Sequence, residues 1–229
     1  MKFHDRLLAS TAEERAALVA TPIIQATLRG EVSPASYLAF LTEAYHHVRH
    51  TASLLAACKA ALPERLAWLA PELDHYIAEE TGHDEWILDD IAACGGDAQA
   101  VRRGRPQPAT ELMVAYAYDT IARGNPVGFF GMVLVLEGTS VALALHAADR
   151  IQQALHLPDG AFSYLRSHGE LDREHTAHFA QLMDLLDDPA DQQAVIHAAR
   201  MFYRLYGEVF RSLPLPAPEP RRAAEEALA

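Results

Sequence analysis

The chain has 229 residues, of which half are hydrophobic, and its 31 acidic and 19 basic side chains give a net charge of −12. This acidity disfavours nucleic acid and anionic membranes as partners, because both are bound through basic residues. The longest apolar run, near 129–136, is too short to span a bilayer. The charged N-terminus lacks the apolar core of a signal peptide, and two isolated cysteines suit a reducing compartment, so we expect a cytoplasmic protein.

The expected elements are all helical. Short helical pieces occupy 7–28, and longer helices are expected at 34–62, 63–94, 111–123, 126–156, 163–188 and 189–213, with Pro71 either kinking the second of them or dividing it in two. No segment alternates with the period of two that a strand requires. The sequence therefore predicts an all-α fold, a single bundle of seven to eight helices over 1–213, followed by a Pro/Ala-rich flexible tail over 214–229.

A stripe of titratable residues occurs where a helix should be apolar. His168, Asp172 and His175 follow one another at i, i+4 and i+7, on the same face as Leu165 and Phe179. Burying such groups without partners costs several kcal/mol each, roughly, so they need compensation. A metal ion shared with other helices would provide it, and so would an internal hydrogen-bond network or a polar groove open to water.

The segment YIAEETGHDEWILDDI contains a glutamate and a histidine at a spacing that is typical of metal ligands on a helix. Glu80 and His83 are three residues apart on a face with Ile77 and Ile87, a spacing that helical-bundle metal sites use. Glu79 is the alternative to Glu80, although its position points toward the flank of the helix. By itself the motif is weak, because it occurs by chance in many helices.

Two further glutamates lie in apolar surroundings. Glu137 is in GFFGMVLVLEGTSVALAL, the least polar stretch of the chain, so it is expected to be buried and held either by a cation or by hydrogen bonds. Glu43 shares a face with His47 and His50, and the sequence leaves open whether Glu43 alone or Glu43 with one of these histidines reaches the centre. Oxygen and nitrogen donors without a thiolate favour iron or manganese over structural zinc. The full set suits two ions bridged by carboxylates: Glu43, Glu80, His83, Glu137, His168, Asp172 and His175.

These motifs together resemble the haem-oxygenase-like diiron oxidases and oxygenases. Glu43, E-x-x-H at Glu80, Glu137 and H-x-x-x-D-x-x-H at His168 follow in that family's order on separate helices, over about residues 35–180. The resemblance implies the seven-helix bundle shared by haem oxygenase, TenA thiaminases and PqqC. It also implies that these residues bind two non-haem iron ions that activate O₂.

The leading hypothesis is an O₂-dependent diiron oxidase or oxygenase that acts on a small organic substrate, with possible homodimerisation. A metal-independent cofactor-biosynthesis enzyme of the TenA or PqqC kind is one alternative. A non-enzymatic iron-binding or helical interaction protein is another. Arg49 and Arg166 could pair with a substrate carboxylate, but exposed arginine is the simpler interpretation of each. The candidate substrate-pocket residues are Tyr45, His47, Phe129, Phe130 and Tyr164.

Overall fold

The computed structural model describes residues 1–216, except for the side chains of 168–175, which belong to a helix. The side chains of His168, Asp172 and His175, and the predicted tail from residue 217 onward, lie outside the described part. Every regular element within that part is helical, which confirms the all-α prediction. The α-helices are α1 Phe3–Ser10, α2 Ala12–Val19, α3 Pro22–Leu28, α4 Pro34–Val48, α5 Thr51–Ala61, α6 Ala70–Glu80, α7 His83–Ala93, α8 Ala98–Arg103, α9 Pro108–Arg123, α10 Phe130–Leu155, α11 Ser163–Leu185 and α12 Pro189–Ser212, with 3₁₀ turns η1 Glu64–Leu69, η2 Pro126–Phe129 and η3 Asp159–Ala161.

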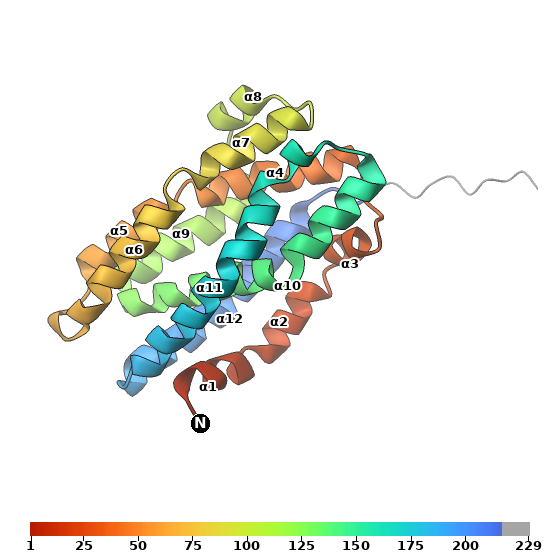
Figure 1. The fold of residues 1–229 in the computed structure, drawn as a ribbon. Coiled ribbons are helices and arrows are strands. Elements are labelled where there is room, and N and C mark those ends of the chain that lie inside the picture. The colour runs from red at the N-terminus through yellow and green to blue at the C-terminus, as the bar shows by residue number, and fades with distance from the viewer. Residues whose placement is uncertain (217–229) are drawn as a thin grey trace, which may run out of the picture.

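The long helices α10, α11 and α12 form the centre of the bundle, and α10 contacts both of the others (Figure 1). Helix α4 packs against α7 and α9, and α5 packs against α6 and α9. The short N-terminal helices cover the centre, since α1 contacts α11, α2 contacts α12 and α3 contacts α10. The bundle thus surrounds α10 on several sides.

Helix α10 is the core helix of the fold. Together with η2 it forms a 30-residue stretch whose most apolar 18-residue window has a mean hydropathy of 1.8, long and apolar enough to cross a membrane by those two measures alone. Yet 56% of its most apolar window is buried inside the protein, as expected for a core helix. A Cβ at Gly131 would lie 2.5 Å from the backbone nitrogen of Ala199, so this glycine lets α10 approach α12 closely.

Two predicted helices are divided. The helix expected at 34–62 ends at Val48 and begins again at Thr51, with no glycine or proline between them to signal the break. The helix expected at 63–94 is interrupted at Gly82, whose φ of 96° is a left-handed conformation that glycine adopts without steric cost. Pro71 lies in the first turn of α6, directly after η1, so the segment is also divided near this proline. Helix α8 was not predicted, and with these divisions the bundle has more than seven to eight helices.

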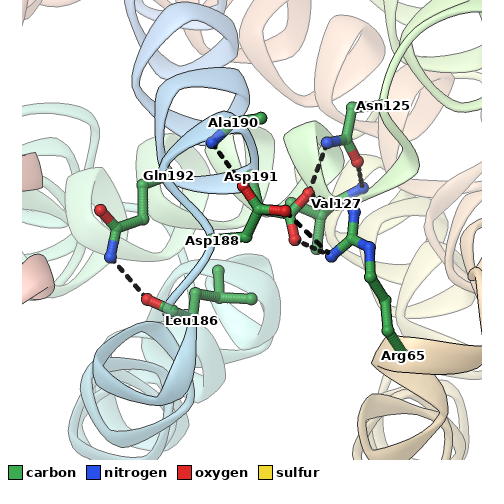
Figure 2. A network of polar contacts seen from close by, with 8 residues as sticks. All are labelled: Arg65, Asn125, Val127, Leu186, Asp188, Ala190, Asp191 and Gln192. Carbon is green, nitrogen blue, oxygen red and sulfur yellow. Dashed lines mark hydrogen bonds and ion pairs between the residues drawn. The ribbon is translucent and has the colours of Figure 1, made fainter.

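A buried carboxylate joins η1, η2 and the start of α12 (Figure 2). Asp191 accepts hydrogen bonds from the guanidinium of Arg65, one of them 2.9 Å long, and from the Asn125 amide at 2.6 Å. Its side chain is 1% exposed. The hydrogen bond and charge of Arg65 lower the pKa of Asp191, so this carboxylate is held ionised.

A second buried carboxylate fixes the start of α11, the helix that carries the predicted H-x-x-x-D-x-x-H motif. Asp90 of α7 is fully buried, and its two oxygens accept from the backbone N–H groups of Ser163 and Tyr164, each at 2.9 Å, and from the Ser163 hydroxyl. It thereby caps α11 from another helix. Burial raises the pKa of Asp90, against the opposite effect of these hydrogen bonds.

Candidate metal and substrate site

One cavity of about 160 Å³ lies among α3, α4, α10 and α12, with α6 and α11 contributing residues to its wall. Most of its wall is aliphatic or aromatic, and the side chain of every third or fourth residue of α10 from Met132 to Ile151 faces it. This is here called the central cavity. Among its described wall residues only three are titratable at neutral or mildly acidic pH, namely His47, Glu80 and Glu137. They mark where chemistry other than apolar contact can occur.

The predicted Glu80–His83 pair forms, but across a break between helices. Glu80 is the last residue of α6 and His83 is the first of α7, and the Nδ1 atom of His83 lies 3.2 Å from Oε2 of Glu80. Their side chains are only 10% and 5% exposed. The His83 ring stacks on Trp86, with ring centroids 4.1 Å apart. The break at Gly82 therefore brings the two groups together, and the indole fixes the plane of the imidazole.

Glu79 and Glu80 are in different surroundings. Glu80 lines the central cavity, whereas Glu79 pairs with His75 at 3.3 Å on the flank of α6, with a third of its side chain exposed. The structure therefore supports the choice of Glu80 over Glu79 as the residue that faces the cavity. Glu137 lines the same cavity from α10, so two carboxylates of the predicted set reach one largely apolar space.

Glu43 is placed differently from the prediction. Although buried, it does not line the central cavity. Its carboxylate accepts from the backbone N–H of Gln107, at 3.1 and 3.2 Å, and from the hydroxyl of Thr110, so it caps the start of α9. The predicted role of Glu43 as a metal ligand stays a prediction, because a carboxylate can accept hydrogen bonds and bind a metal ion at the same time. His47, one turn farther along α4, is the buried histidine of this helix that lines the cavity.

Three of the five predicted pocket residues line the central cavity: His47, Phe129 and Tyr164. The other two predicted pocket residues, Tyr45 and Phe130, do not line it. Tyr45 is buried on another face of α4, with Arg49 above its ring at 5.4 Å, and Phe130 packs against Phe179 in the core.

The two arginines that could have paired with a substrate carboxylate do not line the cavity either. Arg49 is exposed and lies over Tyr45, and Arg166 pairs with Asp159 at 3.3 Å and with Asp149 at 3.7 Å. The interpretation of both as surface arginines agrees with these contacts. A substrate carboxylate would need another partner.

No group of three histidine, cysteine, aspartate or glutamate side chains suited to a metal ion occurs among the side chains that the structure describes. A metal site at the inner wall of the cavity would therefore have to include side chains of 168–175. The backbone of this segment is helical in α11, between Leu165, which lines the cavity, and Phe179, which is buried. The placement of His168, Asp172 and His175 as ligands stays a prediction.

Neither cysteine is placed for nucleophilic chemistry in the cavity. Burial raises the pKa of the Cys58 thiol to about 12 and that of Cys94 to about 11, and neither residue lines the cavity. Both thiols are therefore protonated near neutral pH and weakly nucleophilic. The N-terminal histidine, His4, packs edge-on against Phe179 and does not reach the cavity.

Sequence reasoning missed two polar residues that matter here. Ser140 lines the cavity one turn after Glu137, and its buried hydroxyl has no hydrogen-bond partner among the described residues. Asp90 is in phase with Ile87 and Ile91, so the signal that identified Glu137, an acid on an apolar face, was present. Because Asp89 is adjacent and exposed, the Asp89–Asp90 pair resembled two surface residues.

A family of iron-containing redox enzymes has a sequence model that matches residues 38–207 of the chain. This is well over half of the 229 residues. The chain belongs to this family of iron-containing redox enzymes. The matched range contains the complete predicted ligand set, from Glu43 to His175.

Solved structures of the haem-oxygenase-like fold are similar to the chain. A domain of unknown function from Shewanella denitrificans is 25% identical, with a TM-score of 0.81 over 92% of this chain and 91% of that one. A TenA homologue from Pseudomonas syringae is 14% identical (TM-score 0.77, 90% of each chain), and haem oxygenase from Leptospira interrogans is 16% identical (TM-score 0.75, 93% and 100%). At these identities the last two show the fold alone. No curated protein matches the sequence.

Proposed function

We propose that the protein is an O₂-dependent oxidase or oxygenase that holds two non-haem iron ions at the carboxylate-lined part of the central cavity and oxidises a small organic molecule bound beside them. The observation that carries this proposal is the meeting of Glu80 and Glu137 at one apolar cavity, with His83 in contact with Glu80. Two carboxylates in such surroundings are costly unless a cation or hydrogen bonds compensate them. Membership of an iron-containing redox family favours the cation.

The residues that would hold the iron come from five helices, α4, α6, α7, α10 and α11. They are Glu80, His83 and Glu137, joined by the predicted donors His168, Asp172 and His175 of α11. From α4 we favour His47 over Glu43, because His47 lines the cavity and Glu43 is bound to the start of α9. This donor set of oxygen and nitrogen atoms without thiolate fits iron. Bound iron would supply the reduction of O₂ and the oxidising power; the protein supplies position and environment.

The chain's own residues perform three tasks in this proposal. Trp86 fixes the ring of His83, and the contact of His83 Nδ1 with Glu80 orients both groups, as outer contacts orient ligands in metal sites. Asp90 fixes where α11 begins, five residues before His168. The aliphatic wall of the cavity excludes water from the site, which protects a reactive centre from side reactions.

The test is to add ferrous ion to the purified protein without oxygen, to count iron per chain, and then to admit O₂. We expect about two irons per chain and a transient visible absorption. The variants Glu80→Gln and Glu137→Gln should each lower the iron content by at least half. Glu79→Gln is the matched control, because Glu79 lies on the flank and should leave iron binding unchanged.

A chain that binds no iron and shows no absorption change would contradict the proposal. It would favour the metal-independent alternative of the same fold, in which the histidines contact substrate directly. His168→Ala separates the two, since it should lower iron content in the diiron protein and change nothing in a protein that binds no metal.

A further inference from the structure

We propose that Trp86 is the point at which electrons from an external one-electron donor enter the metal site, by way of His83. The inference rests on the proposed function, because it requires iron bound at His83. Iron left in the ferric state after O₂ has been reduced must be reduced again before the next turnover. Because a donor cannot collide with iron inside a helical bundle, the electrons need a path of closely packed groups from the surface to a ligand.

Trp86 connects a proposed ligand with the surface. Its ring stacks on that of His83, with the centroids 4.1 Å apart and the planes inclined by 27°. His83 is only 4% exposed, whereas Trp86 is partly exposed. Gly82 and Asp89, which lie about one turn before and after Trp86, are both exposed. Because electron transfer weakens steeply with distance, two flat rings in direct contact provide a better path than a saturated side chain.

Hydrogen bonds hold the segment around Trp86 in place. The Trp86 carbonyl oxygen lies 3.4 Å from the hydroxyl of Ser163, and the same hydroxyl donates to Asp90, which is also on α7. Asp90 accepts two backbone N–H groups of α11 as well. These contacts fix α7 against the start of α11. The Trp86 ring therefore extends from a fixed backbone, which favours a constant distance to His83.

Three other aromatic residues meet one of the two requirements, contact with the site or exposure, but not both. Tyr206 contacts His47 edge-on, with ring centroids 5.8 Å apart, but it is buried. Tyr76 lines the central cavity and is also buried. Trp68 is exposed, but it lies in η1 and does not line the cavity. Trp86 meets both requirements.

The proposed step moves electrons only. One donor molecule loses one electron and one ferric ion becomes ferrous, so two donor molecules restore the ferrous pair. The indole couples the donor to His83 without being oxidised or reduced itself, and no bond in the protein forms or breaks. Asp89, a neighbour of Trp86 on the helix surface, and the net charge of −12 favour the approach of a cationic donor.

The test measures how fast the oxidised, iron-loaded protein is reduced by reduced methyl viologen in the absence of O₂. This dye is a cationic one-electron donor, and its charge disfavours passage through the apolar cavity. The loss of its blue colour in a stopped-flow instrument gives the rate. Trp86→Leu should slow this reduction at least tenfold, whereas Trp86→Phe, which keeps an aromatic ring, should stay within about threefold. Trp68→Leu changes the only other tryptophan of the chain and should leave the rate unchanged.

A second pair of variants tests where the donor approaches without altering Trp86. Asp89→Lys and Asp187→Lys change the net charge equally, but Asp187 lies in the loop after α11, at the other end of that helix from Ser163. At low ionic strength Asp89→Lys should slow the reduction about threefold and Asp187→Lys should not, and the difference should vanish at high salt. A purely structural role of Trp86 would not produce this difference.

A structural role is also separated by the first oxidation of the ferrous protein by O₂, for which the electrons come from the iron itself. In Trp86→Leu the loss in the rate of reduction should exceed the loss in the rate of this oxidation at least fivefold. Equal losses in both rates, an equal effect of Trp68→Leu, or equal rates in Asp89→Lys and Asp187→Lys would each overturn the inference and leave the proposed function standing. A chain that takes up no iron would refute both.

Discussion

Glu43 and Asp90 differ from Glu80 and Glu137 in what their carboxylates meet. Glu43 and Asp90 receive the N–H groups at the start of another helix, α9 and α11 respectively, and so replace hydrogen bonds that water would otherwise supply. Glu80 and Glu137 line the central cavity, where Glu80 is also in contact with His83. The four residues look alike as acids in apolar segments, yet the first two are expected to stabilise the fold and the second two to bind a cation. Variants of each pair can test this division.

The largest expected effect on stability is that of Asp90→Ala. The change leaves two backbone N–H groups and one hydroxyl of α11 without their acceptor, and we expect the free energy of unfolding to fall by about 3 kcal/mol. Urea denaturation of the iron-free protein measures it. A loss below about 1 kcal/mol would show that water replaces Asp90 at no cost and would remove this residue from the stabilising pair.

Glu43→Ala should have the next largest effect, about 2 kcal/mol, because the N–H of Gln107 and the hydroxyl of Thr110 lose their acceptor. Glu43→Gln keeps one acceptor oxygen and should cost less, about 1 kcal/mol. The same denaturation experiment compares both with the parent protein. Unchanged stability of Glu43→Ala would place this carboxylate with the cavity pair.

Asp191 extends the comparison to pH. Its pKa is lowered by Arg65, so its contribution to stability is present above the unfolded-state pKa of about 4 and is lost as pH falls through the lower folded-state value. We expect Asp191→Asn to remove about 1 kcal/mol at pH 7 and much less at pH 2.5. Denaturation curves at the two pH values measure the difference. An equal loss at both would contradict the role of the ionised carboxylate.

The smallest effect on stability is expected for Glu80→Gln and Glu137→Gln in the iron-free protein, less than about 1 kcal/mol each. Glutamine keeps the size of the side chain and can still make hydrogen bonds, and it removes a charge from apolar surroundings. Thermal unfolding without iron checks this. A loss as large as that of Asp90→Ala would mean that these carboxylates hold the fold together.

The helical class and the position of the long helices followed from the sequence, because apolar periodicity and proline or serine starts are local signals. The breaks within the predicted helices were harder to predict from the sequence. Gly82 carries a recognisable signal, but the break between Val48 and Thr51 contains neither glycine nor proline. At this break the Nδ1 atom of His50 lies 3.2 Å from the Tyr118 hydroxyl, a contact between distant segments that no local pattern encodes.

The candidate site was predicted only in part, again because local sequence patterns do not encode contacts between distant segments. Apolar neighbours correctly indicated that Glu43, Glu80 and His83 are largely buried, whereas Glu137, which was also expected to be buried, is partly exposed. The sequence could not indicate which cavity or helix end each group meets, since that depends on how helices pack. Glu43 was therefore grouped with the metal ligands, whereas the structure places it at the start of α9.

The most direct test of the division is the iron content of Glu137→Gln and Glu43→Gln, prepared side by side by anaerobic addition of ferrous ion. The two variants replace one glutamate each by the same neutral residue, so they differ only in where the carboxylate lay. We predict that Glu137→Gln loses at least half of the iron and that Glu43→Gln keeps it. Iron lost from Glu43→Gln and retained by Glu137→Gln would contradict this account.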